Sequence, residues 1–220
     1  LVYSIIKGTD NIDHSVVDVP FQVPNKKELK SLRVGYIKSA FENRKTTLNE
    51  KNVLSRLKEL GFNLIPIELP DFPTNSLSFL LNVEAAAAFD ELTRNNTDEK
   101  LVRQKKWAWP NIFREARYVP AVEYIQANRA RVLLNQKMAD LFQNIDVYVV
   151  PSFWKDNLLR TNLTGHPCVV LPNGFDQEGL PTSISFVGDI YKDGEVIAVS
   201  HAYQRVTGWH KKYPPNFDNE

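Results

Sequence analysis

An apolar strand, an amphipathic helix and a second apolar strand follow one another directly, and this order constrains the fold more than any other feature. Residues 32–37 (LRVGYI) predict a short buried strand, and residues 48–60 place apolar side chains at helical spacing. Residues 62–69 (FNLIPIEL) predict a second strand, in which Pro66 suggests an edge position or a bulge. Because such a strand, crossover helix and strand form a βαβ unit with parallel strands, we expect an α/β fold.

The rest of the chain supplies further elements for the same sheet. Apolar residues at helical spacing predict helices over residues 76–93, 110–116, 120–144 and 195–206. Short apolar or alternating runs predict strands over residues 146–151, 168–172 and 182–188, with a hairpin turn over 173–181. We therefore expect a mixed, largely parallel sheet flanked by helices.

The first 32 residues show no sustained apolar period. Residues 1–8 resemble the last two turns of a helix that Gly8 would cap. We interpret residues 1–32 as a connector over the surface and residues 33–220 as the α/β body. A chain that begins without Met on the end of a helix is expected to be part of a longer protein.

Two side-chain patterns predict how the helices pack. In the helix over residues 120–144, an apolar stripe that includes Ile125 and Val132 is expected to face the sheet. Trp107 and Trp109 follow two lysines, a combination that could stack on nucleic-acid bases. Because no wider basic patch surrounds them, we expect these tryptophans to wedge between helices instead.

Composition and charge exclude several classes of partner. The chain of 220 residues has 43% apolar residues, enough for a sizeable core, and its 27 basic and 26 acidic residues nearly cancel. A net charge of +1 supplies no broad field for nucleic acid or anionic lipid, and no apolar run approaches the roughly 20 residues that span a bilayer. We expect no direct nucleic-acid partner and no membrane partner. The compartment stays open between cytoplasmic and exported.

Cofactor and metal signatures are missing. The first strand-to-helix turn, residues 38–45, lacks the glycines through which a backbone approaches a dinucleotide. The four histidines are far apart in sequence and match no metal-binding spacing, and Cys168 is the single cysteine. We expect no cofactor and no metal, and Cys168 is expected to be buried at the start of its strand.

Several stretches in the same order resemble one family. They are LVYSIIKGTDNIDHSVVDVPF at the start, LRVGYI, LKELGFNLIPIELP, DVYVVPSF, TNLTGHPCVVLPNG and GLPTSISFVG. Together they are similar to the C-terminal half of the amidase signature enzymes, which include bacterial amidases and the glutamine-hydrolysing subunit of tRNA-dependent amidotransferases. EARYVPAVEYIQANRAR suggests the bacterial amidase branch. The resemblance covers most of the chain and implies the C-terminal part of an amidase signature fold.

The resemblance also implies a mechanism whose residues this sequence lacks. The family uses a serine nucleophile, a serine held by a cis peptide and a lysine base, set in a Gly- and Ser-rich segment. Here all nine glycines stand apart, so no GGSSGG-like loop exists in the 220 residues, and no stretch matches the motif of the lysine. The expected role is the substrate-pocket-forming part of a hydrolase that cleaves carboxamide C–N bonds in small molecules, inactive without the catalytic half.

Residues 161–167 are expected to form the floor of that pocket. The resemblance makes Asn162, Thr164 and Gly165 the candidate substrate-pocket residues, and none of them is a candidate catalytic residue. His166 lies beside Pro167 in a turn, where a histidine more often satisfies backbone groups than takes part in catalysis.

A second interpretation belongs to another class of protein. The chain could be a free-standing, non-catalytic α/β module that binds a ligand or a partner. A truncated core of this kind would expose a sheet edge, through which self-association is expected. An excised enzyme fragment would expose the same edge, so association does not separate the two interpretations.

Overall fold

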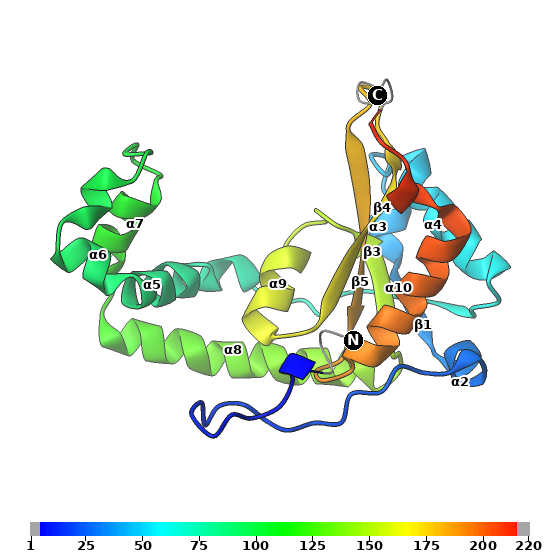
Figure 1. Cartoon of the computed structure of the whole chain (residues 1–220), viewed down its shortest axis with the longest axis horizontal. Coiled ribbons are helices and arrows are strands. Elements are labelled where there is room, and N and C mark those ends of the chain that lie inside the picture. The colour runs from blue at the N-terminus through cyan, green and yellow to red at the C-terminus, as the bar shows by residue number, and fades with distance from the viewer. Residues whose placement is uncertain (1–4, 215–220) are drawn as a thin grey trace. The chain divides into compact units, whose positions relative to one another are not determined.

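The protein is described by a computed structural model that covers residues 5–214 and forms two compact units (Figure 1). Within the described residues, the sheet unit comprises residues 5–70 and 138–214, and the helical unit comprises Asp71–Lys137. The expected α/β body over residues 33–220 therefore contributes to both units. The predicted helix turns over residues 1–8 lie largely outside the described residues.

A five-stranded mixed sheet forms the centre of the sheet unit. Its strands are β1 (Val34–Ile37), β2 (Leu64–Ile67), β3 (Val147–Pro151), β4 (Cys168–Phe175) and β5 (Pro181–Gly188). The order is β2-β1-β3-β5-β4. β1 pairs in parallel with β2 and β3, whereas β5 pairs antiparallel with β3 and β4. The predicted α/β class and mixed sheet are confirmed, and Pro66 lies on the edge strand β2.

The helices of the sheet unit lie on both sides of the sheet. They are α2 (Lys26–Ser31), α3 (Lys38–Phe41), α4 (Leu48–Glu59), α9 (Asn157–Thr164) and α10 (Asp193–Thr207), followed by the 3-10 turn η3 (Trp209–Lys211). α4 and α10 pack on β4 and β5, and α9 lies on the other side of these strands (Figure 1). The buried apolar residues of β1 and β3 make this sheet the core of the unit.

Local sequence signals explain where α4 and α2 begin. The Thr47 hydroxyl accepts a hydrogen bond from the Glu50 amide, and the Glu50 carboxylate accepts one from the Thr47 amide at 2.7 Å. Asn25 and Glu28 form the same capping box at the start of α2. The helix at residues 26–31 was not predicted, because it buries no residue and so carries no apolar period.

The helical unit contains the elements between β2 and β3. These are η1 (Thr74–Leu77), α5 (Phe79–Ala88), α6 (Asp90–Arg94), η2 (Thr97–Lys100), α7 (Trp109–Ala116) and α8 (Ala121–Phe142), whose last residues belong to the sheet unit. The single helix predicted over residues 76–93 is wrong, since it breaks at Phe89. Phe89 stacks on Phe113 with ring centroids 5.5 Å apart, and Asp90 pairs with Arg94 and Arg117. The contacts with Phe113 and Arg117 connect the break to α7 and to the residue that follows it.

The long helix is confirmed, but its expected apolar stripe is partly wrong. Ile125 and Val132 are 57% and 55% exposed. The residues that α8 buries are Ala127, Leu134, Met138 and Phe142. Their spacings of seven and four residues follow a helix face that the wider apolar stripe only partly overlaps.

The segment after β3 departs most from the sequence-based prediction. Residues 151–160 were expected to form a loop, but α9 begins at Asn157 and ends where Gly165 adopts a φ of +77°. The buried positions of α9 are Asn157, Arg160, Thr161 and Thr164. They repeat at helical spacing, but because all four are polar, an apolar periodicity does not reveal the helix.

One glycine of α10 permits a close backbone approach that a side chain would prevent. A Cβ atom at Gly194 would lie 1.8 Å from the carbonyl oxygen of Gln22. Replacing Gly by Ala in a helix normally stabilises it by about 0.5–1 kcal/mol. Here we expect Gly194→Ala to destabilise the chain by roughly 1–3 kcal/mol, because the methyl group overlaps this carbonyl.

Thermal unfolding followed by circular dichroism measures this effect. Gly208→Ala is the matched control, since Gly208 has a φ of +64° and no neighbouring atom within 4 Å of an added Cβ. It should cost about 1 kcal/mol, from backbone strain only. A Gly194→Ala variant as stable as the parent chain would contradict the close approach.

Candidate functional site

The sheet changes the direction of its chain order at β1. The chain passes from β1 to β2 on one side and later returns to β3 on the other side, with all three strands parallel. The carboxyl ends of β1 and β3 therefore meet at one edge of the sheet. In open α/β sheets, ligands bind in the crevice outside such strand ends.

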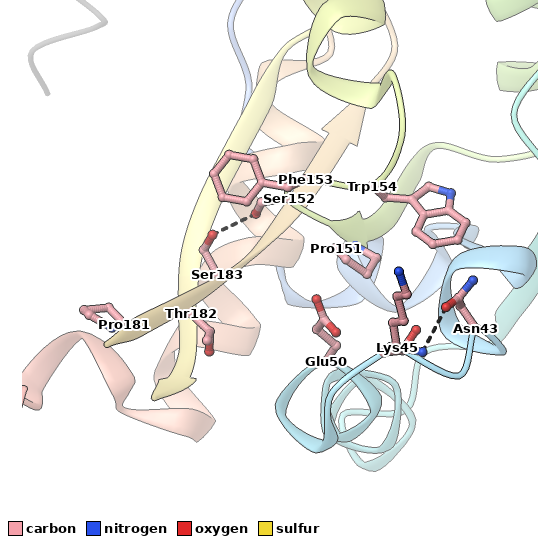
Figure 2. A pocket seen from close by; sticks show the side chains of 11 residues that line it. Asn43, Lys45, Glu50, Pro151, Ser152, Phe153, Trp154, Pro181, Thr182 and Ser183 are labelled. Atoms are coloured by element: carbon pink, nitrogen blue, oxygen red, sulfur yellow. Dashed lines mark hydrogen bonds between the residues drawn. The ribbon is translucent and has the colours of Figure 1, made fainter. Parts of the chain in front are cut away.

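A cavity of about 280 Å³ lies at this edge (Figure 2). We call it the strand-end cavity. It combines residues that follow β1, residues that follow β3, and the start of β5. Its lining residues are Asn43, Lys45, Thr46, Glu50, Pro151, Ser152, Phe153, Trp154, Pro181, Thr182 and Ser183.

Serine hydroxyl groups line the β3 and β5 side of the strand-end cavity. Ser152 Oγ accepts hydrogen bonds from Ser183 Oγ and Ser185 Oγ, each at 3.0 Å, and Figure 2 shows the first of them. A hydroxyl that accepts twice retains its own proton for a third group. The residues that line this cavity include no histidine, so nothing resembling a Ser–His pair activates Ser152 there. The arrangement can bind a polar group through these hydroxyls.

Charged side chains reach the opposite side of the strand-end cavity. Lys45 and Glu50 extend toward Pro151 in Figure 2. One Glu50 oxygen is held by the Thr47 amide and hydroxyl at 2.7 and 3.0 Å. Trp154 and Phe153 add aromatic surface, so the cavity offers polar and apolar contacts together.

The three predicted pocket residues lie at the C-terminal end of α9, and none of them lines the strand-end cavity. Asn162 and Gly165 are exposed. Thr164 is buried, and its hydroxyl donates to the Arg160 carbonyl oxygen at 2.8 Å. The expected tight turn at residues 161–165 is thus the end of a helix. Asn162 and Gly165 are accessible there, whereas Thr164 is buried and hydrogen-bonded within the helix.

His166 is held by side chains rather than by the backbone groups that the sequence suggested. Its Nδ1 lies 2.7 Å from Thr164 Oγ1, and its ring stacks on Phe142 with centroids 5.1 Å apart. Nε2 is 3.8 Å from Asp189 Oδ1 and has no hydrogen-bond partner among residues 5–214. Burial lowers the pKa of His166, and the negative charge of Asp189 opposes this only in part.

A buried polar group joins α9 to β3. The Tyr148 hydroxyl donates to Asn157 Oδ1 at 2.9 Å, and burial raises the pKa of this phenol far above its usual value. Arg160, only 3% exposed, forms an ion pair with Asp156 at 2.8 Å. Its Nε and Nη1 have no hydrogen-bond partner among the described residues. This guanidinium therefore lacks part of its hydrogen bonding, which is unusual because buried donors are nearly always paired in folded proteins.

Cys168 is exposed, so the expectation that it would be buried is wrong. It begins β4, the last strand of the sheet, and Val170 on the same strand is 55% exposed. Cys168 and Val170 stand two residues apart and therefore share one face of the sheet. We call these two positions the open face of β4.

The described part of the chain offers neither a metal cluster nor a membrane-spanning helix. Residues 5–214 contain no group of three or more His, Cys, Asp or Glu side chains placed to hold a metal ion. Across the same residues, every helix is too short or too polar to cross a membrane.

Sequence reasoning missed Ser152 and Arg160. Ser152 directly follows a predicted buried strand parallel to β1, so the rule for strand ends at a change of chain order could have identified it. Arg160 required recognition of α9, whose period is carried by polar residues. For Ser185, register with β3 was the missing information, because only strand pairing places it beside Ser152.

The depressed pKa of His166 gives a prediction for stability against pH. Folded and unfolded chains both hold a neutral ring well above pH 6.5, the ordinary histidine value. As the pH falls below 6.5, the unfolded chain binds a proton that the folded chain does not, so folding stability decreases. The decrease continues until the pH reaches the folded-state pKa.

Urea unfolding at pH 7.5, 6.5 and 5.5 measures this slope. His166→Gln removes the titrating group and should unfold with a shallower pH dependence than the parent chain. Asn144→Gln replaces an exposed side chain that does not titrate and should keep the parent slope. Equal slopes in all three proteins would show that His166 is not buried in its neutral form.

Comparison with known proteins adds to this geometry. A family model described as Amidase matches residues 1–160. The chain is 26% identical over 262 residues to a glutamyl-tRNA(Gln) amidotransferase subunit of Microcystis aeruginosa, covering 97% of this chain and 54% of that protein. It is 25% identical over 248 residues to an amidase of Pseudomonas putida, covering 97% and 52%.

Solved structures agree with the fold. The native peptide amidase from Stenotrophomonas maltophilia superimposes with a TM-score of 0.71 at 19% identity, over 96% of this chain and 51% of that one. The chain spans about half the length of the curated relatives that it matches. With a family model over most of its length and the same fold in the solved structures, the chain belongs to the amidase signature family of hydrolases.

Proposed function

We propose that this chain is the substrate-pocket-forming part of an amidase signature hydrolase that cleaves the C–N bond of small carboxamides. The nucleophilic serine, the second serine and the lysine base come from residues outside these 220. The observation that carries the proposal is the combination of family membership with nine glycines that all stand apart. A Gly- and Ser-rich catalytic segment has no place in such a sequence.

Buried polar atoms around α9 and β4 support the need for further residues. Arg160 Nε and Nη1, His166 Nε2 and Asn173 Nδ2 are buried without hydrogen-bond partners among the described residues. An unpaired buried donor or acceptor costs about 1–3 kcal/mol. Groups supplied by another segment would remove this cost, and the open face of β4 gives such a segment apolar surface to cover.

In this proposal the end of α9 contributes to the wall of the pocket. Asn162 offers an exposed amide and Gly165 an exposed backbone that a substrate can approach. Thr164 has another role, since its hydroxyl is engaged by the Arg160 carbonyl and lies 2.7 Å from His166. Thr164 therefore positions the loop that carries Gly165.

The first prediction is that the 220-residue chain does not hydrolyse amides, whereas the longer protein that contains it does. Ammonia release from a panel of primary carboxamides measures turnover, and a fluorophosphonate probe reports an activated serine. The longer protein should react with the probe, and the 220-residue chain should not. Activity or labelling of the short chain that Ser152→Ala abolishes would overturn the proposal.

The second prediction concerns Asn162. In the active, longer protein, Asn162→Ala should raise KM about tenfold with little change in kcat, as expected when a binding contact is removed. Asn144→Ala replaces an exposed asparagine just after α8 and should leave both constants unchanged. If KM stays the same in Asn162→Ala, Asn162 does not contact the substrate.

The alternative function, a non-catalytic interaction module, is an outcome of the same work. If the longer protein also fails to hydrolyse amides, the open face of β4 remains as a surface for a partner or for self-association.

A further inference from the structure

One segment of the helical unit has a composition that the proposed hydrolase function does not use. Residues 100–110 (KLVRQKKWAWP) lead from η2 into α7. The segment carries four cations and no acidic residue, although the whole chain has a net charge of only +1. We call it the basic aromatic segment.

Large apolar side chains of the basic aromatic segment are directed to solvent. Val102 is fully exposed at 100%, Trp107 is 80% exposed and Trp109 is 46% exposed. The expectation that both tryptophans wedge between helices is therefore wrong for Trp107. These side chains surround a shallow hollow of about 560 Å³ lined by Leu101, Val102, Arg103, Lys105, Trp107, Ala108, Trp109 and Pro110.

Hydrogen bonds hold the segment in this exposed arrangement. The Gln104 side-chain amide donates to the carbonyl oxygens of Asp98 and Leu101, each at 2.9 Å. The Asn111 side chain donates to the Gln104 and Lys105 carbonyl oxygens at 3.2 and 3.0 Å. Trp109 stacks on Phe113 with centroids 5.6 Å apart. The apolar side chains are thus presented by an ordered backbone.

We propose that the basic aromatic segment binds the surface of an anionic lipid bilayer. Trp107 and Val102 enter the interface between headgroups and acyl chains, where the amphipathic indole ring is favoured. Lys100, Arg103, Lys105 and Lys106 contact the headgroup phosphates. The attachment is peripheral, and it requires no helix that crosses the membrane. It departs from the expectation of no membrane partner, which rested on the net charge of the whole chain and not on this local group of four cations.

Two other occupants fit the segment less well. A second copy facing the same segment would place four cations against four cations, which opposes association. A single-stranded nucleic acid would use the tryptophans for stacking, but it has no contact for the fully exposed aliphatic side chain of Val102. A lipid surface uses the cations, the indoles and the aliphatic side chain together.

Vesicle co-sedimentation with the 220-residue chain tests the proposal. Vesicles with about 30% phosphatidylserine in phosphatidylcholine should bind the chain at least tenfold more strongly than pure phosphatidylcholine, because only the former attracts the cations. Added salt should weaken this binding, and tryptophan fluorescence should shift to shorter wavelength. Absence of binding to the anionic vesicles would overturn the proposal, as would equal binding to both compositions.

Variants separate the segment from the remaining surface. Trp107→Ala should lower binding at least fivefold, and Lys105→Gln with Lys106→Gln should lower it and reduce its salt dependence. Lys211→Gln with Lys212→Gln removes another exposed basic pair, next to Trp209, and should bind like the parent chain. Circular dichroism verifies folding of each variant. Unchanged binding by the segment variants, or binding of single-stranded DNA without binding of vesicles, would refute the lipid assignment.

Discussion

The parallel pairing of β1 with strands on both sides is the constraint on which the rest of the structure depends. Parallel neighbours cannot be joined by a tight turn, so each pairing requires a crossover connection. α4 supplies the short crossover to β2, and the connection from β2 to β3 holds the entire helical unit. The same pairing brings the carboxyl ends of β1 and β3 together and so creates the strand-end cavity. The parallel pairing of β1 thus explains both the architecture and the position of the candidate site.

The apolar strands could be predicted from the sequence because burial on both faces demands continuous apolar residues, as in β3. The α4 helix could also be predicted, from its apolar spacing and from Gly61 beyond its end. α9 was not, because its buried face consists of Asn, Arg and Thr side chains. Side-chain exposure was also hard to predict. Trp107 and Cys168 are exposed, although tryptophan and cysteine are usually well buried.

Much of the candidate site depends on tertiary pairing that a single sequence does not contain. The register between β3 and β5 places Ser185 opposite Val150, and this brings its hydroxyl to Ser152. The family resemblance directed attention to residues 161–167, and the geometry divided them into exposed Asn162 and Gly165 and buried Thr164. The polar layer between α9 and β3 is the part with the largest unmet demand for hydrogen bonds among the described residues. In the proposed function, groups from outside this chain would meet that demand.

Cys168 allows the open face of β4 to be labelled selectively. It is the one cysteine in the sequence, so a thiol reagent modifies the chain at a single known atom. Burial of part of the side chain raises the pKa of the thiol, and the thiolate that reacts is therefore scarce at neutral pH. A spin label or fluorophore attached in mildly alkaline buffer reports directly on that strand. Its mobility falls when another polypeptide covers β4 and stays high when the strand faces water, so one probe distinguishes the covered state from the bare one.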